Sequence, residues 1–264
     1  MRHRLSVSLV ALVASLALSA SAEAQGRDVY LLPEIAESPM MSMGRAQPGV
    51  AASSPVGYGP NKGDVFAGLG FQNSTASGGD SDGSLSIGAG FMNSQELLGI
   101  EAVLTSLSTV RSGFGSRMVG SLKAHKAINN WGLGLGVEGI YLNGNEFDTD
   151  PSIYFAATTV RPVREAETFN QATLNFGLGT GRFQSAESFA DGKSGVGVFA
   201  SAAIRVNYFS SAILDYTGAQ LNAAMSFSPF ATMPIVITPS INDLTGAAGN
   251  AGRLALGAGI SWKF

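Results

Sequence analysis

The chain has 264 residues, of which 45% are hydrophobic and 13% are charged, with a formal net charge of −3 and no cysteine. The charged share is about half of the roughly 25% that is typical of soluble domains, which indicates a membrane protein. The missing cysteine excludes disulfide frameworks, thiolate metal sites and cysteine nucleophiles. An acidic balance without a basic cluster argues against a nucleic-acid partner.

The first 24 residues have the pattern of a secretory signal peptide. Arg2 and Arg4 precede an apolar run over residues 5–20, and Ala22 and Ala24 are small residues at the two positions that a signal peptidase reads. A spanning helix needs roughly 18 apolar residues, so a membrane anchor is the weaker interpretation. We expect cleavage before Gln25 and export of the mature chain.

Residues 25–62 differ in kind from the rest of the chain. They contain five prolines, at positions 33, 39, 48, 55 and 60, and three methionines, at 40, 41 and 43, without hydrophobic alternation. This composition predicts either a periplasmic tail, which is the simpler interpretation, or a plug that folds into the following domain.

From residue 63 onward apolar and small or polar residues alternate with a period of two, which is the pattern of β-strands. Around Trp131 the alternation places Trp131, Val137 and Tyr141 on one face and Glu138 and Ile140 on the other. We expect about twelve strands, with a range of 10–14. They lie near residues 65–71, 85–91, 98–104, 118–124, 131–141, 153–157, 172–178, 196–204, 212–216, 221–227, 235–241 and 254–264.

The second face of these strands distinguishes between two all-β architectures. It carries Gly, Ser, Thr, Asn and Ala with few ionisable residues, while the other face is continuously apolar. A soluble sandwich needs a charged exterior, which 13% charged residues do not supply. An apolar exterior around a polar interior is typical of a transmembrane barrel. We therefore expect an all-β fold in which residues 63–264 form a single antiparallel up-and-down transmembrane β-barrel.

The predicted connections alternate in length, as they do between the two ends of such a barrel. Long polar connections are expected at residues 73–82, 108–115, 143–150, 184–194 and 243–250, and short ones at 93–96, 129–130, 164–168 and 207–209. Residues 217–219 and 228–234 break the pattern, since the first is short for the outside and the second long for the inside.

Four aromatic residues, Trp131, Tyr141, Tyr208 and Trp262, are expected at the membrane interfaces. Trp131 and Tyr141 are ten residues apart, about 33 Å along a strand at roughly 3.3 Å per residue. With a tilt of about 45°, this distance spans roughly 23 Å, close to the ~25 Å apolar band of outer-membrane barrels.

The last five residues, Ile260-Ser-Trp-Lys-Phe264, resemble the terminal strand of bacterial outer-membrane β-barrel proteins, which include the porins. The resemblance implies that the barrel-assembly machinery reads Phe264. A second, fainter resemblance runs from Leu214-Asp-Tyr-Thr-Gly218 to Asp243-Leu-Thr-Gly246 and is to exopolysaccharide-associated barrels of the YjbH type.

Few residues point to chemistry. His125 is the one histidine of the expected mature chain, and no Ser or Asp stands out as its partner, so a lumen-lining role is favoured over an outer-membrane hydrolase. We expect no catalytic, metal or cofactor site. The glycine strings 132–136 and 177–181 lie within strands rather than before helices, so they are not phosphate loops. On the inner face they either keep the lumen open or allow close backbone approach.

Ionisable residues on the inner face form the main candidate site. Aligning the neighbouring strands places Lys123 one diagonal step from Glu101 and Glu138, with His125 and Arg117 on the same face of the strand. We predict a Glu101–Lys123–Glu138 cluster, which is either a structural salt-bridge network or a constriction that selects solutes by charge.

Three classes of function remain. The first is a passive channel for small hydrophilic solutes. The second is a non-conducting structural or surface barrel of the cell envelope, of the kind that serves polysaccharide export or assembly. A hydrolase is the remote third. The expected partners are outer-membrane lipid, the assembly machinery and small solutes, and the expected location is the bacterial outer membrane.

Overall fold

The computed structural model describes residues 47–74, 80–107, 109–110, 113–144, 151–163, 168–190, 194–249 and 252–264. The expected signal peptide, its cleavage before Gln25 and residues 25–46 of the N-terminal segment lie outside the described residues.

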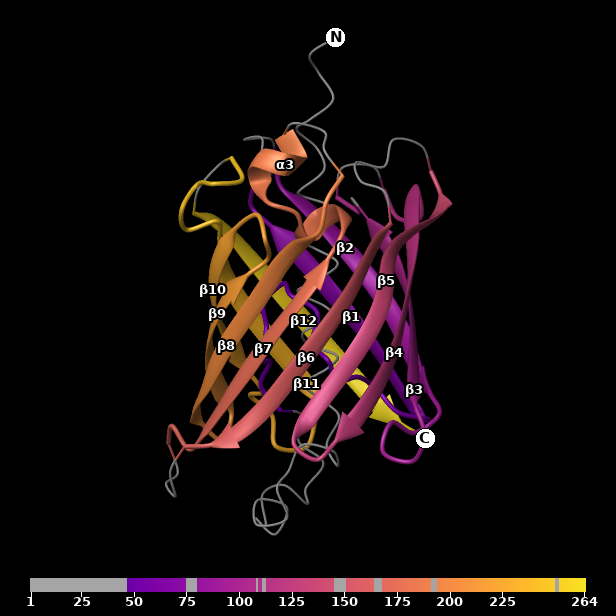
Figure 1. Cartoon of the computed structure of the whole chain (residues 1–264), viewed down its shortest axis with the longest axis vertical. Coiled ribbons are helices and arrows are strands. Elements are labelled where there is room, and N and C mark those ends of the chain that lie inside the picture. The colour runs from indigo at the N-terminus through magenta and orange to yellow at the C-terminus, as the bar shows by residue number, and fades with distance from the viewer. Residues whose placement is uncertain are drawn as a thin grey trace.

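The described residues form twelve strands in one closed antiparallel barrel, in which each strand pairs with its neighbours in the sequence (Figure 1). β1 pairs with β12, with Asp64 opposite Lys263, which closes the barrel. The expected up-and-down barrel is confirmed. The strands are β1 Asp64–Gln72, β2 Asp82–Phe91, β3 Gly99–Leu107, β4 Arg117–Ile128, β5 Trp131–Asn143, β6 Ser152–Pro162, β7 Gln171–Gly179, β8 Gly197–Asn207, β9 Ser210–Tyr216, β10 Leu221–Phe227, β11 Ile235–Asn242 and β12 Arg253–Lys263.

Helical turns occur in the connection between β7 and β8, as the 3-10 turn η2 Gly181–Phe183 and the short helix α3 Ala186–Ala190. Within the described part of the chain, no helix has the length and apolarity that crossing a membrane requires. Because β7 ends at Gly179, the β7–β8 connection begins at Thr180, four residues before the expected start at residue 184.

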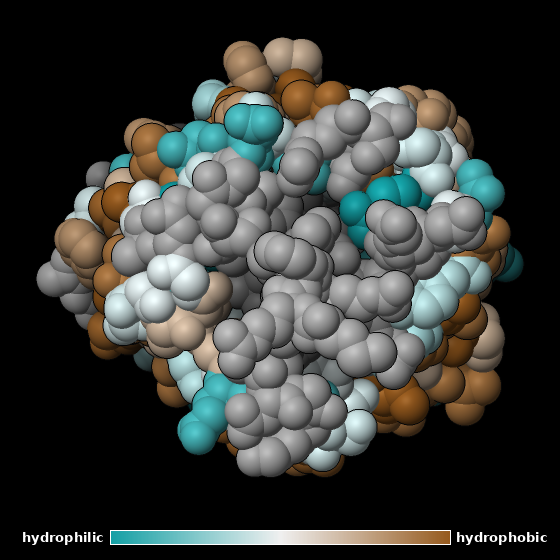
Figure 2. All heavy atoms as spheres, turned by 90° about the horizontal axis from the view of Figure 1, so that it is seen from above, coloured by the Kyte–Doolittle hydropathy of each residue, from teal (hydrophilic) through white to brown (hydrophobic). Residues whose placement is uncertain are grey.

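The two faces of the barrel wall differ as the alternation predicts. Large apolar side chains are exposed on the outside, as at Leu69 (56%) and Leu135 (59%). Small polar side chains such as Ser86, Thr158 and Asn222 are buried on the inside. Seen from above, hydrophobic residues surround the rim of the molecule (Figure 2). This apolar exterior suits a surrounding of lipid. The closure of the barrel suits it as well, because each strand pairs on both sides and the backbone hydrogen bonds are made within the sheet.

Most long connections lie at one end of the barrel and most short ones at the other. The short β9–β10 connection, residues 217–220, lies among the long ones, and residues 228–234 form a long connection among the short ones. The connections 129–130, 208–209 and 228–234 share one end with the start of β1 and the end of β12. The β7–β8 connection, which contains α3, lies at the other end, at the top of Figure 1. We refer to these as the short-connection end and the long-connection end.

A bulge in β5 changes the expected faces of its last residues. Gly139 has a φ of +73°, and the β4–β5 register shifts at this point. Beyond the shift, Ile140 pairs with Gly120 and Tyr141 pairs with the buried Val119. The prediction that Tyr141 shares the outer face of Trp131 is therefore wrong, because the extra residue of the bulge reverses the alternation.

Candidate functional site

Residues 47–62, called here the inner loop, lie inside the barrel and contact its inner wall from β4 round to β10. Near its start, Gly49 donates its N–H to Ser226 Oγ (2.7 Å), one residue from the end of β10. Near its end, the Pro60 carbonyl is 3.1 Å from Nε2 of His125 in β4. Both contacts lie toward the short-connection end. Residues 51–60 are all buried in the interior of the barrel.

The carboxylate of Asp215 in β9 holds the deepest part of the inner loop. Its Oδ2 accepts the backbone N–H groups of Ala52 (2.7 Å), Ser53 (2.6 Å) and Ser54 (3.0 Å). The Ser54 hydroxyl donates to Oδ1 of the same carboxylate. Successive backbone N–H groups that converge on one anion form a nest, and the fully buried Asp215 is the anion here.

Arg182 approaches the same part of the loop from the turn η2. Its Nη1 donates to the Ser53 carbonyl (3.2 Å), and its Nε forms an ion pair with the Glu138 carboxylate. The guanidinium carbon lies 4.1 Å from the centre of the Phe183 ring. A charge that is buried in this way is held by several partners at once, which fixes η2 against the lumen.

Threonine and asparagine side chains of the wall form hydrogen bonds with the backbone in the middle of the inner loop. The Gly57 N–H donates to Thr158 Oγ1 (2.8 Å), and Asn175 Nδ2 donates to the Pro55 carbonyl (3.1 Å). The Thr158 hydroxyl in turn donates to Asn175 Oδ1 (2.7 Å). Each polar group is therefore satisfied although it is buried.

Inward glycines of β5 provide the space in which the inner loop packs. A Cβ on Gly132 would overlap the Tyr58 ring, and a Cβ on Gly134 would lie 3.2 Å from the Gly57 Cα. The Tyr58 hydroxyl donates to the Asn130 carbonyl (2.8 Å). Of the two roles that the sequence allowed for these glycines, the second applies, since the loop backbone and ring fill the space.

Glu101 and Lys123 face each other directly across β3 and β4, with Lys123 Nζ 2.7 Å from Glu101 Oε2. Both side chains are buried. Lys123 also donates to the Tyr58 carbonyl (2.7 Å), so the pair supports the inner loop. His125 lies beside them, and its ring packs against Gly59 and Gly99.

The predicted Glu101–Lys123–Glu138 cluster is divided into two separate ion pairs in the structure. The β3–β4 register places Glu101 directly opposite Lys123 rather than one diagonal step away, so the predicted diagonal arrangement is wrong. Glu138 sits next to the β5 bulge and forms its ion pair with Arg182, a residue that the sequence analysis did not single out. Arg117 is six residues from Lys123, roughly 20 Å along β4 and at the long-connection end.

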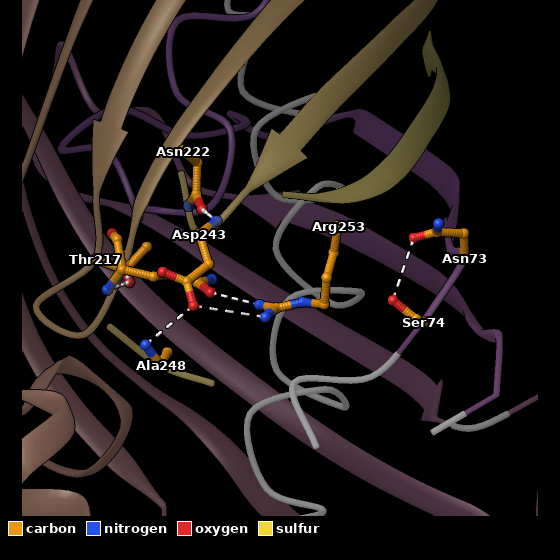
Figure 3. A network of polar contacts seen from close by, with 8 residues as sticks. Asn73, Ser74, Thr217, Asn222, Asp243, Ala248 and Arg253 are labelled. Carbon is orange, nitrogen blue, oxygen red and sulfur yellow. Dashed lines mark hydrogen bonds and ion pairs between the residues drawn. The ribbon is translucent and has the colours of Figure 1, made fainter. Parts of the chain in front are cut away.

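A second polar network lies near the long-connection end, outside the inner loop (Figure 3). Arg253 Nη2 donates to Gln220 Oε1 (2.7 Å), and Nη1 is 3.7 Å from Asp243 Oδ2. The same Asp243 oxygen accepts the Ala248 N–H (3.0 Å), and the Asp243 N–H donates to Asn222 Oδ1 (3.0 Å). These contacts fasten the β11–β12 connection over the wall.

The other residues singled out in the sequence lie at the short-connection end. Trp131 begins β5, Tyr208 is in the β8–β9 turn, and Trp262 is next to the last residue of β12. The Phe264 side chain is 92% exposed, while its backbone N–H donates to the Gly63 carbonyl (2.9 Å). Their roles at the membrane interface and in assembly stay predictions.

No protein-family model and no curated protein sequence matches the chain. Among solved structures, it is similar to a KdgM porin in complex with disordered oligogalacturonate, at 9% identity and a TM-score of 0.45, over 76% of this chain and 99% of that one. It is also similar to the Acinetobacter baumannii outer membrane protein Omp33, at 10% identity and a TM-score of 0.37, over 76% and 97% of the two chains.

Proposed function

We propose that this protein is an outer-membrane β-barrel that passes small hydrophilic solutes, and that the inner loop occupies the solute path in the structure described here. The supporting observation is the chemistry of the inner wall. Small neutral polar groups and glycines line much of it beside the charged groups, and Thr158, Asn175 and Ser226 hydrogen-bond to one chain segment, the inner loop. A wall of this kind surrounds a water-filled path once that segment moves.

The location follows from the same proposal. The exposed apolar residues of the outer face suit the lipid of the bacterial outer membrane, and the exposed Phe264 is available to the barrel-assembly machinery. The buried His125, held between the inner loop and β3, supports a structural role for this residue rather than catalysis.

A non-conducting envelope barrel is the second candidate, and one observation favours it. Residues 51–60 are buried without exception, which is what a permanently closed lumen requires. The two candidates differ in whether the inner loop ever leaves.

The decisive experiment is planar-bilayer recording of the refolded mature chain beside a variant that lacks residues 47–60. The proposed channel predicts rare openings in the full chain and a continuous conductance in the shortened one. If the shortened barrel refolds, as judged by heat-dependent gel mobility, and is silent, the channel proposal is wrong and the closed barrel stands.

A further inference from the structure

We propose that Asp215 has two roles: it latches the inner loop in the closed barrel, and it makes the lumen select cations once the loop has left. The inference rests on the proposed channel function and names the charge of the solutes that the open path favours. It follows from which wall charges lose their partners when the loop moves.

In the closed barrel, the hydrogen bonds to the Asp215 carboxylate come from the inner loop. Three loop N–H groups and the Ser54 hydroxyl donate to it. Residues 47–61 contain no charged side chain. Departure of the loop therefore takes away four donors from Asp215 without carrying any charge out of the lumen.

Two charged pairs beside the deep part of the loop have both partners outside it. Lys123 pairs with Glu101 across β3 and β4, and Arg182 pairs with Glu138. Both pairs persist without the loop, because neither partner belongs to it. Three carboxylates and two cations make a net charge of −1 for these five groups, and Asp215 is the carboxylate in excess. Arg182 attracts Asp215 electrostatically but is already shared with Glu138.

An unpaired carboxylate in the wall of a narrow lumen controls which ions enter. The apolar exterior of the barrel concentrates the field of the charge inside the lumen, which attracts cations and repels anions. The same charge favours return of the loop. The three converging N–H groups of the loop solvate the Asp215 carboxylate in place of the water that leaves when the path closes. One side chain thus links the closure of the path to its selectivity.

The test uses the full mature chain in planar bilayers under a KCl gradient, with Asp215→Asn compared with wild type. Loss of the charge-assisted bonds should raise the frequency of openings about tenfold or more. The permeability ratio of K⁺ to Cl⁻ should fall toward one in the same recordings.

Two further variants separate the two roles. Ser54→Ala removes one bond to Asp215 but keeps the charge, so openings should increase while cation selectivity stays as in wild type. Asp82→Asn changes another buried carboxylate of the wall, which accepts its own neighbour's N–H at Gly83 (2.8 Å) rather than one from the loop, so the opening frequency should not change.

Each outcome of these recordings supports or refutes one part of the proposal. If Asp215→Asn and Ser54→Ala both open at the wild-type frequency, the latch is refuted. If Asp215→Asn opens more often with unchanged selectivity, the second role is refuted and the latch stands. Silence of every variant, including one that lacks residues 47–60, refutes the channel function instead. If Asp215→Asn does not refold, Ser54→Ala alone still tests the latch, and anion-selective openings in it refute the cation preference.

Discussion

Replacing Gly132 with alanine is expected to shift the inner loop out of the lumen. The new Cβ would overlap the ring of Tyr58, which is 4% exposed and whose hydroxyl is bonded to Asn130. The neighbouring backbone cannot relieve this overlap easily, since Gly132 lies in a strand paired on both sides, with Ala127 and Thr158.

The expected magnitude follows from the kind of overlap. Overpacking of one methyl group in a tightly packed interior costs roughly 1–3 kcal/mol. The cost falls on the closed barrel alone, because the methyl group faces open lumen once the loop has left. The population with the loop out should therefore rise by about 5- to 150-fold. The gain in strand propensity from glycine to alanine is common to both states and cancels.

The assay is the swelling rate of liposomes that contain the refolded protein in an isotonic solution of a small neutral sugar. Gly120→Ala is the matched control in the neighbouring strand, because a Cβ there meets only the flexible end of Leu142, at 3.3 Å. The control should swell as wild type does. Equal rates for Gly132→Ala and wild type, with both barrels folded, would refute the argument that the loop competes with solute for this wall.

Three further predictions concern charged and terminal residues. Lys123→Met leaves the buried Glu101 carboxylate without its counter-charge and should lower the free energy of unfolding in urea by about 3–5 kcal/mol. Arg182→Ala removes the partner of Glu138 and a donor to a loop carbonyl, so liposome swelling should become faster. Phe264→Ser should reduce the amount of barrel assembled in cells while leaving the urea midpoint of refolded protein unchanged, because the side chain is exposed.

Each of these predictions has a contrasting result. Lys263→Met serves as a control for Lys123→Met, since the Lys263 side chain is 61% exposed, is 4.0 Å from Asp64 and should lose less than about 1 kcal/mol. Similar losses at both lysines would contradict the burial argument. Arg182→Ala with wild-type swelling would show that Arg182 does not restrain the loop. Normal assembly of Phe264→Ser would remove the role that the terminal strand's resemblance implies.

The strands were predictable because alternation is a local signal that the barrel preserves almost everywhere. Leu69, Leu135 and Leu256 stand on the outer face where the period of two places them. One exception is β5 beyond Gly139, where an inserted residue reverses the faces of Ile140 and Tyr141. The sequence around Gly139 looks like any other glycine-containing strand, so the bulge left no readable trace.

The candidate site was only partly predictable. Glu101 and Lys123 lie on adjacent strands, and their pairing needed only the face and an approximate register. The partner of Glu138 comes instead from a connection after β7, which alternation does not position. The route of the inner loop had a faint signal, namely an uncharged stretch over residues 47–61 and glycines on the inner face of β5, but neither feature shows that the two meet.

The central claim, that movement of the inner loop opens the barrel, is tested most directly by fastening the loop to the wall. Asn222 Nδ2 and Ser53 Oγ are 3.4 Å apart, and the chain has no cysteine of its own. Ser53→Cys combined with Asn222→Cys, joined by a short reducible thiol crosslinker, fixes the loop in place. Single-channel recording should show a silent barrel when crosslinked and openings after reduction. Equal conductance before and after reduction would contradict the account.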